Sequence, residues 1–209
     1  MRISYVLLSP TFGMHQYTAD LANRLAREGH DVHLVTTSRA PKDRYIPAVG
    51  IETPVDTSDT GFSQESLRVA GLRAAGGAVL DLEPDVVHFS GPHAWNLPLL
   101  RRCRSRGLST VHTLHDLDPH VGSGYGALLR LWNRQVVRLT DHILVHGQTY
   151  YERVLQMGVP PERVTSTPLL HLFVGGAWLG AWPDLAASVE YRPWALFFGR
   201  LKEYKGIDY

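Results

Sequence analysis

Short apolar runs alternate with longer amphipathic segments along most of the chain. Residues 3–9 form a continuous apolar run, which is typical of a strand that is covered on both faces. Residues 17–28 repeat apolar side chains at helix spacing, and Gly29 stands where a helix commonly ends. Residues 31–36 return to a strand pattern. This opening predicts a strand, a turn over residues 10–15, a helix and a second strand.

The same alternation continues after a loop at residues 38–61, in which we expect at most one short strand. We predict helices and strands in turn at residues 64–82, 85–89, 95–105, 109–114, 127–139, 142–145, 150–157 and 163–166. Strands that alternate with helices imply a parallel sheet with right-handed crossovers. We therefore predict an α/β fold with a doubly wound, Rossmann-like parallel sheet over residues 1–167. A connector at 168–193 and the truncated start of a second Rossmann-like domain at 194–209 follow.

Ligands bind to such sheets beyond the carboxyl ends of the strands. That rule points to the segments 10–15, 36–38, 90–93, 115–124 and 146–148. The first of them holds Gly13 directly before a helix, and a glycine backbone there could approach a phosphate or a sugar closely. A plain tight turn is an equal alternative at this position.

The first turn disfavours an enzyme that binds a nicotinamide cofactor. Such a domain needs G-x-G-x-x-G after its first strand and an acidic residue at the end of its second. Here the turn holds one glycine, and the second strand ends in Thr36, Thr37 and Ser38. The phosphate loop G-x-x-x-x-G-K-[ST] is also missing from the sequence. A nicotinamide-dependent epimerase or dehydrogenase and a P-loop kinase are therefore disfavoured.

The end of the chain has the pattern of an anion site. An apolar run breaks at Gly199, and Arg200 and Lys205 follow in a predicted loop and the first turn of a helix. Helix N-termini present free N–H groups and the positive end of the helix dipole. The alternative is a solvated charged turn, but Gly199 and Gly206 bracket the two cations and favour phosphate binding. One strand and one turn cannot bury a core, so we expect most of a second domain to be missing.

Four segments in this order resemble retaining glycosyltransferases of family 4, which have the GT-B architecture. They are a glycine loop followed by L-A-x-x-L-x-x-x-G-H-x-V at residues 10–32, P-D-V-V-H at 84–88, a strand ending in H-D at 110–116, and G-R followed by K-G at 199–206. The chain departs from the family pattern at Met14, which replaces a second glycine, and at 167–171, which replaces a P-N-G-V-D-like connector. The family's acidic E-x7-E element is absent from the sequence.

The resemblance implies transfer of a sugar from a nucleotide-diphosphate donor to an acceptor hydroxyl with retention of configuration. It assigns Arg200 and Lys205, with Gly199 and Gly13, to the donor diphosphate, whose growing charge fixed cations would stabilise. It implies that His115 is the catalytic histidine beside the reacting sugar. The alternative is a loop histidine that bonds to backbone.

The resemblance also places the acceptor on the N-terminal domain, across a cleft from the nucleotide. His15, His93 and Asp116 are the predicted acceptor-side residues, although Asp116 could instead cap its turn. The acceptor would be a glycan or a lipid-linked molecule. The chain alone is expected to be inactive because the donor domain is missing.

We predict no metal site and no cofactor besides the donor substrate. His112, His115, Asp116, Asp118 and His120 lie close together in the sequence. Side chains alternate along a strand, however, so His112 and His115 should point to opposite faces and not converge on zinc. The resemblance also implies transfer without a metal.

Composition fits a globular protein of the cytoplasm. The chain has 209 residues, of which 44% are hydrophobic and 20% charged, with a net charge of +1. So small a charge excludes a general attraction to nucleic acid. Cys103 is the single cysteine, which excludes an internal disulfide and suits a reducing compartment. The sequence contains neither a signal peptide pattern nor an apolar stretch long enough to cross a bilayer.

Peripheral contact with a membrane is a second expectation. It rests on the apolar segment 169–182 and on a cluster of arginines at a predicted helix end, namely Arg101, Arg102, Arg104 and Arg106. The alternative is that these cations offset the helix dipole and that the apolar segment packs on protein.

A different class of function also fits the sequence. The chain could be a non-catalytic module that binds a glycan or a partner, or half of a split enzyme whose second chain supplies the missing domain.

Overall fold

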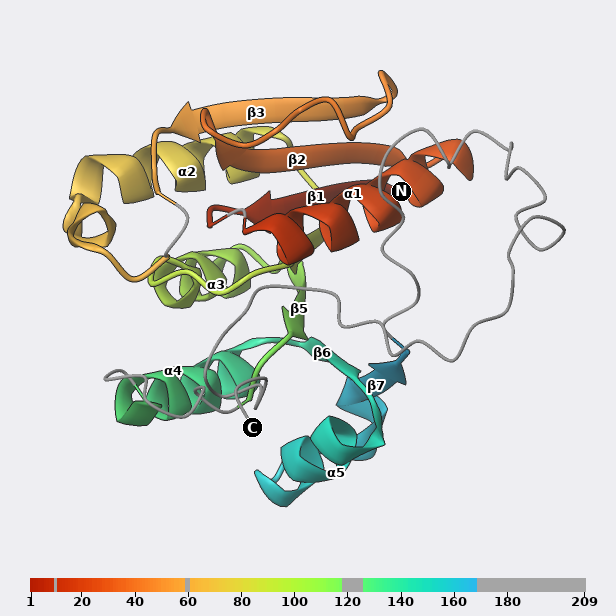
Figure 1. Ribbon diagram of the computed structural model, residues 1–209, viewed down its shortest axis with the longest axis vertical. Coiled ribbons are helices and arrows are strands. Elements are labelled where there is room, and N and C mark those ends of the chain that lie inside the picture. The colour runs from red at the N-terminus through yellow and green to blue at the C-terminus, as the bar shows by residue number, and fades with distance from the viewer. Residues whose placement is uncertain (10, 59–60, 118–125, 169–209) are drawn as a thin grey trace, which may run out of the picture.

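The strands form one parallel sheet in the computed structural model, which describes residues 1–9, 11–58, 61–117 and 126–168 (Figure 1). Across the described residues the order is β3-β2-β1-β4-β5-β6-β7, and every neighbouring pair is parallel. The strands are β1 (Arg2–Leu7), β2 (Asp31–Thr37), β3 (Val49–Val55), β4 (Val86–Phe89), β5 (Ser109–Leu114), β6 (His142–His146) and β7 (Val164–Thr167). This sheet confirms the predicted fold class.

Helices cover the two faces of the sheet unevenly (Figure 1). They are α1 (Phe12–Arg27), α2 (Val69–Asp81), α3 (Asn96–Ser105), α4 (Gly126–Leu139) and α5 (Gln148–Gln156), with short 3₁₀ helices at Gln64–Leu67 and Pro161–Arg163. On one face, α1 packs with Tyr5 and Leu34 in a smaller core. On the other face, α2, α3, α4 and α5 contribute to a larger core with Phe89 and Ile143.

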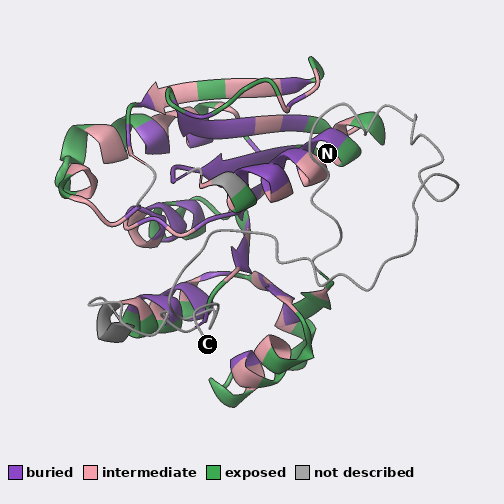
Figure 2. Cartoon of the chain, viewed as in Figure 1, coloured by how far each residue is buried: buried purple, intermediate pink, exposed green. Residues whose placement is uncertain are grey.

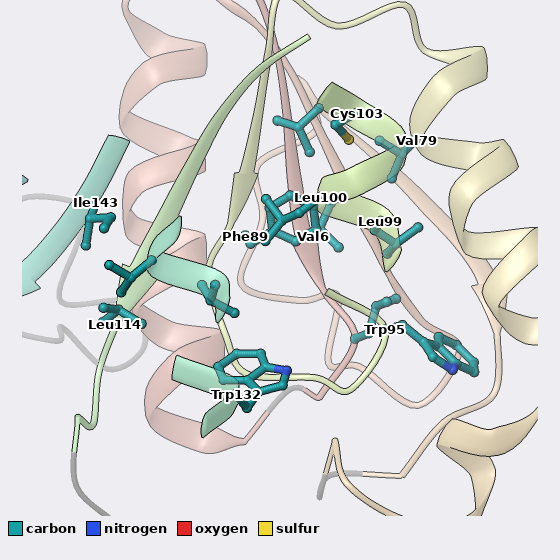
Figure 3. Packing of buried hydrophobic residues seen from close by; sticks show 14 of the residues in the cluster. Val6, Val79, Phe89, Trp95, Leu99, Leu100, Cys103, Leu114, Trp132 and Ile143 are labelled. Carbon is teal, nitrogen blue, oxygen red and sulfur yellow. The ribbon is translucent and has the colours of Figure 1, made fainter. Parts of the chain in front are cut away.

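Alternation along each strand separates the two cores. In β1, Tyr5 and Leu7 belong to the core under α1, whereas Val6 belongs to the larger core. Figure 3 shows how the larger core gathers Val6, Phe89 and Leu100 around the sheet, with Trp132 of α4 at its end. The central strands β1, β2, β4 and β5 are mostly buried, which explains their apolar runs in the sequence. The edge strands β3 and β7 are more exposed (Figure 2).

Helix α1 begins at Phe12 and not at residue 17 as predicted. Thr11 has an extended backbone, with φ −66° and ψ 155°, at the N-terminal capping position. The first turns were hidden in the sequence because their buried face carries polar residues such as His15 and Gln16. Gly13 and His15 therefore lie within the helix and not in a turn.

The predicted helix 64–82 is divided at Arg68 into a 3₁₀ helix and α2. The pair Gly76-Gly77 does not interrupt α2, although glycine weakens helices. A Cβ atom at Gly76 would lie 3.2 Å from Cδ2 of Leu99 in α3. The glycine thus lets the two helices approach each other closely.

Residues 169–209 lie outside the described part, so the connector, the start of a second domain and the proposed domain boundaries stay predictions. Among the described residues, no helix is long and apolar enough to cross a membrane. The sheet changes direction between β1 and β4, where successive connections leave on opposite sides. In open α/β sheets, the crevice outside such a point is the usual ligand site.

Candidate functional site

Polar residues gather at the carboxyl edge of the sheet, where β1, β4, β5 and β6 end. The hydroxyl groups of Thr18 in α1 and Ser90 after β4 lie 2.8 Å apart and are buried. Ser9, after β1, donates its hydroxyl to the carbonyl of Pro92. These contacts join the two loops that flank the change of direction in the sheet.

His115 directly follows β5 at this edge. Its Nε2 lies 2.9 Å from the carbonyl oxygen of Ser90. Because a carbonyl only accepts, Nε2 carries the proton, and the neutral ring keeps its lone pair on Nδ1. Burial lowers the pKa of His115, so the ring is neutral at pH 7. The residue can therefore accept a hydrogen bond from a hydroxyl group through Nδ1.

Two further rings pack around His115. The ring of Tyr17 from α1 lies 5.1 Å from that of His115, at an interplanar angle of 89°. It also lies 5.1 Å from the ring of His146, which ends β6. The rings of His115 and His146 are 5.1 Å apart. We name these three residues the edge cluster.

Hydrogen bonds continue beneath the edge cluster. The hydroxyl of Tyr17 lies 3.3 Å from Oγ1 of Thr113, and that oxygen lies 2.8 Å from Nε2 of His88. Burial lowers the pKa of His88 to about 3 and also lowers the pKa of His146. The cluster and its support are therefore uncharged at neutral pH, and suit hydroxyl groups better than anions.

A small cavity of about 70 Å³ lies beside His115. Its lining is Met14, Pro92, His112, Thr113, Leu114, His115, Asp116, Leu129, Trp132 and Asn133. Three of these residues carry a buried polar atom without a hydrogen-bond partner: Nδ1 of His112, Nε1 of Trp132 and Oδ1 of Asn133. An unpaired buried polar atom costs about 1–3 kcal/mol. The cavity has room for about two water molecules, or for one hydroxymethyl group.

The structure places Gly13 and Asp116 where a ligand could reach them. Both are exposed. Gly13 lies in the first turn of α1, where free N–H groups point toward the carboxyl edge, and a Cβ atom there would meet nothing within 4 Å. Asp116 lines the small cavity. Their predicted roles remain untested by this arrangement.

His15 and His93 are both buried, with 1% of each exposed. Nδ1 of His93 accepts the N–H of Trp95 at 3.1 Å, and the two rings lie 4.7 Å apart. Nδ1 of His15 lies 3.4 Å from the hydroxyl of Tyr45, on the side of α1 away from the edge cluster. Either histidine could therefore affect an acceptor only through other residues.

The predicted diphosphate residues Gly199, Arg200 and Lys205 lie outside the described residues. In the described ranges, no three His, Cys, Asp or Glu side chains are grouped so that they could hold a metal ion. His112 stacks on Phe89 and meets Trp132, whereas His115 meets Tyr17. The two histidines thus lie on opposite faces of the sheet, as strand alternation requires.

Sequence reasoning found His115 but gave Tyr17 and His146 no role in the site. The strand-end rule did point to residue 146, because it closes a strand at the carboxyl edge. The contact of Tyr17 depends on the start of α1, which the sequence pattern placed too late.

The sequence profile of Glycosyltransferase Family 4 matches residues 13–168. No curated protein matches the chain.

Several solved structures share the fold at low identity. The UDP-GlcNAc 2-epimerase of Methanocaldococcus jannaschii has a TM-score of 0.59 at 12% identity, over 79% of this chain and 45% of that one. Apo UGT2 of Phytolacca americana has a TM-score of 0.55 at 14% identity, over 87% and 55%. Anabaena Alr3699/HepE in complex with UDP and glucose has a TM-score of 0.55 at 14% identity, over 80% and 44%.

These likenesses show the fold alone. The chain spans about half the length of each of these structures. A 2-epimerase and a protein bound to UDP and glucose both share the fold. The fold by itself therefore does not decide between transfer and epimerisation.

Proposed function

The chain belongs to glycosyltransferase family 4, through a match over residues 13–168, and from this membership we propose that it supplies the acceptor-side domain of a retaining transferase. The enzyme would move a sugar from a nucleotide-diphosphate donor to an acceptor hydroxyl. The observation that carries the proposal is His115 at the carboxyl edge of the sheet, neutral and fixed by the carbonyl of Ser90, which follows β4.

His115 would contact the reacting sugar. Its bond to the Ser90 carbonyl fixes both the tautomer and the direction of the ring, so Nδ1 is prepared to accept a donor-sugar hydroxyl. The ring of Tyr17 packs edge-on against the ring of His115, and the ring of His146 packs against it at a tilt. A fixed ring loses little conformational entropy when the substrate binds.

The donor diphosphate would lie between two positive groups. The N-terminus of α1 at Gly13 presents free N–H groups, which stabilise an anion. Arg200 and Lys205 with Gly199 would contact the same diphosphate from the second domain. The charge that develops on the leaving group needs such fixed positive groups, so the proposal includes neither a metal nor another cofactor.

The acceptor would approach from the side of Asp116 and the small cavity. The unpaired atoms of His112, Trp132 and Asn133 favour a polar group that can both donate and accept. A hydroxymethyl or hydroxyl group of a glycan, free or lipid-linked, has that chemistry. His15 and His93, which are both buried, would act on the acceptor only through other residues.

Similar folds give some support for the donor class. Alr3699/HepE is seen in complex with UDP and glucose, and a UGT transferase from Siraitia grosvenorii in complex with UDP. We extend to this chain only the class of a nucleotide diphosphate sugar.

The test is transfer of labelled sugars from a panel of nucleotide diphosphate sugars to glycan and lipid-linked acceptors. The chain is assayed alone and together with a polypeptide that carries the family's nucleotide-sugar domain. We expect turnover only with both polypeptides, and a product whose anomeric coupling in proton NMR matches that of the donor.

Other results would contradict the proposal in distinguishable ways. Inversion at the anomeric carbon would refute retention. Epimerisation of the donor at C2 without an acceptor would indicate the other activity known on this fold. Glycan binding without any transfer would favour the non-catalytic module, and turnover by the chain alone would refute the need for a second domain.

A further inference from the structure

A groove lies between α4 and α5 on the face of the sheet opposite to α1. It consists of two adjoining hollows of about 410 Å³ and 200 Å³. The larger is lined by Arg134, Val137, Arg138, Gln156, Met157, Gly158, Val159 and Arg163. The smaller is lined by Leu117, Arg130, Asn133, Arg134, Arg153, Gln156 and Met157. Shared residues at 134, 156 and 157 make the two hollows one groove.

The two hollows lie at different distances from the edge cluster. The smaller hollow reaches toward the carboxyl edge, because Leu117 follows β5 and Asn133 also lines the small cavity beside His115. The larger hollow is formed by the last turns of α4 and α5 and by the segment that follows α5. In parallel sheets, the helices run opposite to the strands, so these helix ends lie toward the amino edge. The edge cluster lies at the carboxyl edge, on the other face (Figure 1).

The lining of the groove is strongly basic. Five of its residues are arginines, at positions 130, 134, 138, 153 and 163, and none of its described residues is acidic. Arg130, Arg134 and Arg138 follow one another at four-residue steps and so share one face of α4. Like charges at this spacing cost a helix about 0.2–0.5 kcal/mol per pair.

Some arginines of the chain form ion pairs with acidic side chains, whereas no such pair is described for these three. Arg2 pairs with Asp31, and Arg39 pairs with Asp56. Within the described ranges, Arg130, Arg134 and Arg138 form neither a hydrogen bond nor an ion pair, and all three are exposed. In Figure 2, exposed and buried stretches alternate along α4.

Arg163 is held in place at one end of the groove. Its Nε donates to the carbonyl of Asp141 at 3.1 Å, and its Nη2 donates to the carbonyl of Val137 at 3.2 Å and to that of Thr140. These carbonyls close the C-terminus of α4, where a cation is stabilised by the helix dipole. The contacts leave Nη1 available and fix the guanidinium beside the groove.

We propose that the larger hollow of the α4–α5 groove binds a phosphate-bearing anion at a site separate from the edge cluster. Guanidinium groups bind phosphate oxygens in pairs, and several arginines without acidic partners provide that recognition. The larger hollow is within the usual size range of small-molecule sites. Val137, Val159 and Met157 add apolar contacts, so a ligand with a phosphate and an apolar part fits best. A phospholipid headgroup and a soluble phosphorylated compound share this chemistry.

The experiment compares two double variants of the full chain that lose the same charge. R134Q/R138Q removes two groove arginines, and R101Q/R104Q removes two exposed arginines of α3. Circular dichroism confirms that both variants keep the fold. Binding of inorganic phosphate is followed by amide chemical shifts in NMR, and binding to vesicles of phosphatidylglycerol and phosphatidylcholine by sedimentation.

The native chain is expected to bind at least one of the two probes with shifts centred on α4 and α5. R134Q/R138Q should weaken binding at least tenfold, whereas R101Q/R104Q should change it less than twofold. Loss of phosphate binding indicates a soluble ligand, and loss of vesicle binding alone indicates a lipid headgroup.

A charge-conserving variant separates arginine recognition from general attraction. R134K/R138K keeps both charges but loses the paired N–H geometry, so we expect binding a few-fold weaker than native. Equal effects of R134Q/R138Q and R101Q/R104Q would overturn the proposal, because they would reflect overall charge. Absence of binding to both probes would also overturn it. Neither result depends on transferase activity, so the proposed function stands or falls separately.

Discussion

The carboxyl edge of the sheet and the α4–α5 groove are two polar regions with opposite electrostatics. At the edge, burial lowers the pKa of His88, His115 and His146, so these rings are neutral and contact their neighbours. In the groove, exposed arginines stay charged and three of them lack a described partner. Burial therefore decides which region suits the hydroxyl groups of a sugar and which suits an anion.

The largest expected effect is a loss of stability in acid, because the buried histidines must then take up protons. Burial lowers the folded-state pKa of His88 and His112 to about 3 and that of His93 to about 4. An unfolded histidine has a pKa of about 6.5. Between these values, the unfolded chain binds more protons, so the free energy of unfolding falls as pH falls, by up to about 1.4 kcal/mol per pH unit for each histidine.

Asp20 opposes this trend in part. Burial raises its folded-state pKa to about 6, so between pH 6 and about 4 the folded chain binds its proton more tightly and gains stability as pH falls. Three histidines lower the free energy of unfolding as pH falls and one carboxyl raises it, so we expect a net decrease in stability. Urea unfolding at pH 7, 6, 5 and 4.5 measures this decrease. A free energy of unfolding that does not change with pH would contradict the conclusion that these buried histidines are neutral.

One substitution makes the acid test specific. In H93N, the side-chain oxygen can replace Nδ1 as acceptor for the N–H of Trp95, and the titrating group is lost. We expect this variant to show a shallower decline between pH 6.5 and 4 than the native chain.

Removing the histidine at the centre of the edge should have the next largest effect. In the two-polypeptide enzyme, H115A should lower kcat about 100-fold, because a positioned hydrogen-bonding group contributes on that order. H115N, which keeps an acceptor near the position of Nδ1, should retain more activity than H115Q, which instead keeps a donor near the position of Nε2. H30A, in the turn after α1 at the opposite edge, is the control and should stay near native.

The opposite result for the two conservative variants would change the role assigned to His115, although the tautomer would stay the same. If H115Q were the more active, donation to Ser90 would matter more than acceptance from a substrate hydroxyl. His115 would then be a positioning residue and not a catalytic one.

The two faces of α4 offer a smaller test within one helix. Val136 is fully buried in the larger core, whereas Arg134 faces the groove. V136A should reduce the free energy of unfolding by about 2 kcal/mol, from lost burial and the cavity that remains. R134A should change it by less than about 0.5 kcal/mol. A large loss in R134A would show that the arginines serve the fold and not a ligand.

The groove and the edge leave different traces in the sequence, for a physical reason, although no role was predicted for the groove arginines. Three groove arginines follow helix periodicity, so their common face can be read from the spacing of 130, 134 and 138 alone. The sheet was also predictable, because buried parallel strands have continuous apolar runs. His115 was found because it follows such a run.

The contacts within the edge could not be read in the same way. Tyr17, His115 and His146 come from α1, β5 and β6, and meet only when the strand order and the start of α1 are known. The polar residues His15 and Gln16 on the buried face of α1 masked that start. Unpaired atoms such as Nε1 of Trp132 depend on packing in three dimensions and leave no pattern in the sequence.

The smallest expected effect concerns the link between the edge cluster and its support. Y17F removes the hydroxyl that lies 3.3 Å from Oγ1 of Thr113 but keeps the ring contacts with His115 and His146. Thr113 still bonds to His88, so no buried partner is left unpaired. We expect a loss of about 0.5–1 kcal/mol in urea unfolding and an unchanged position of the His115 ring resonances in NMR. Y17A, which removes the ring, should shift those resonances, and identical effects of the two variants would show that the ring does not hold His115 in place.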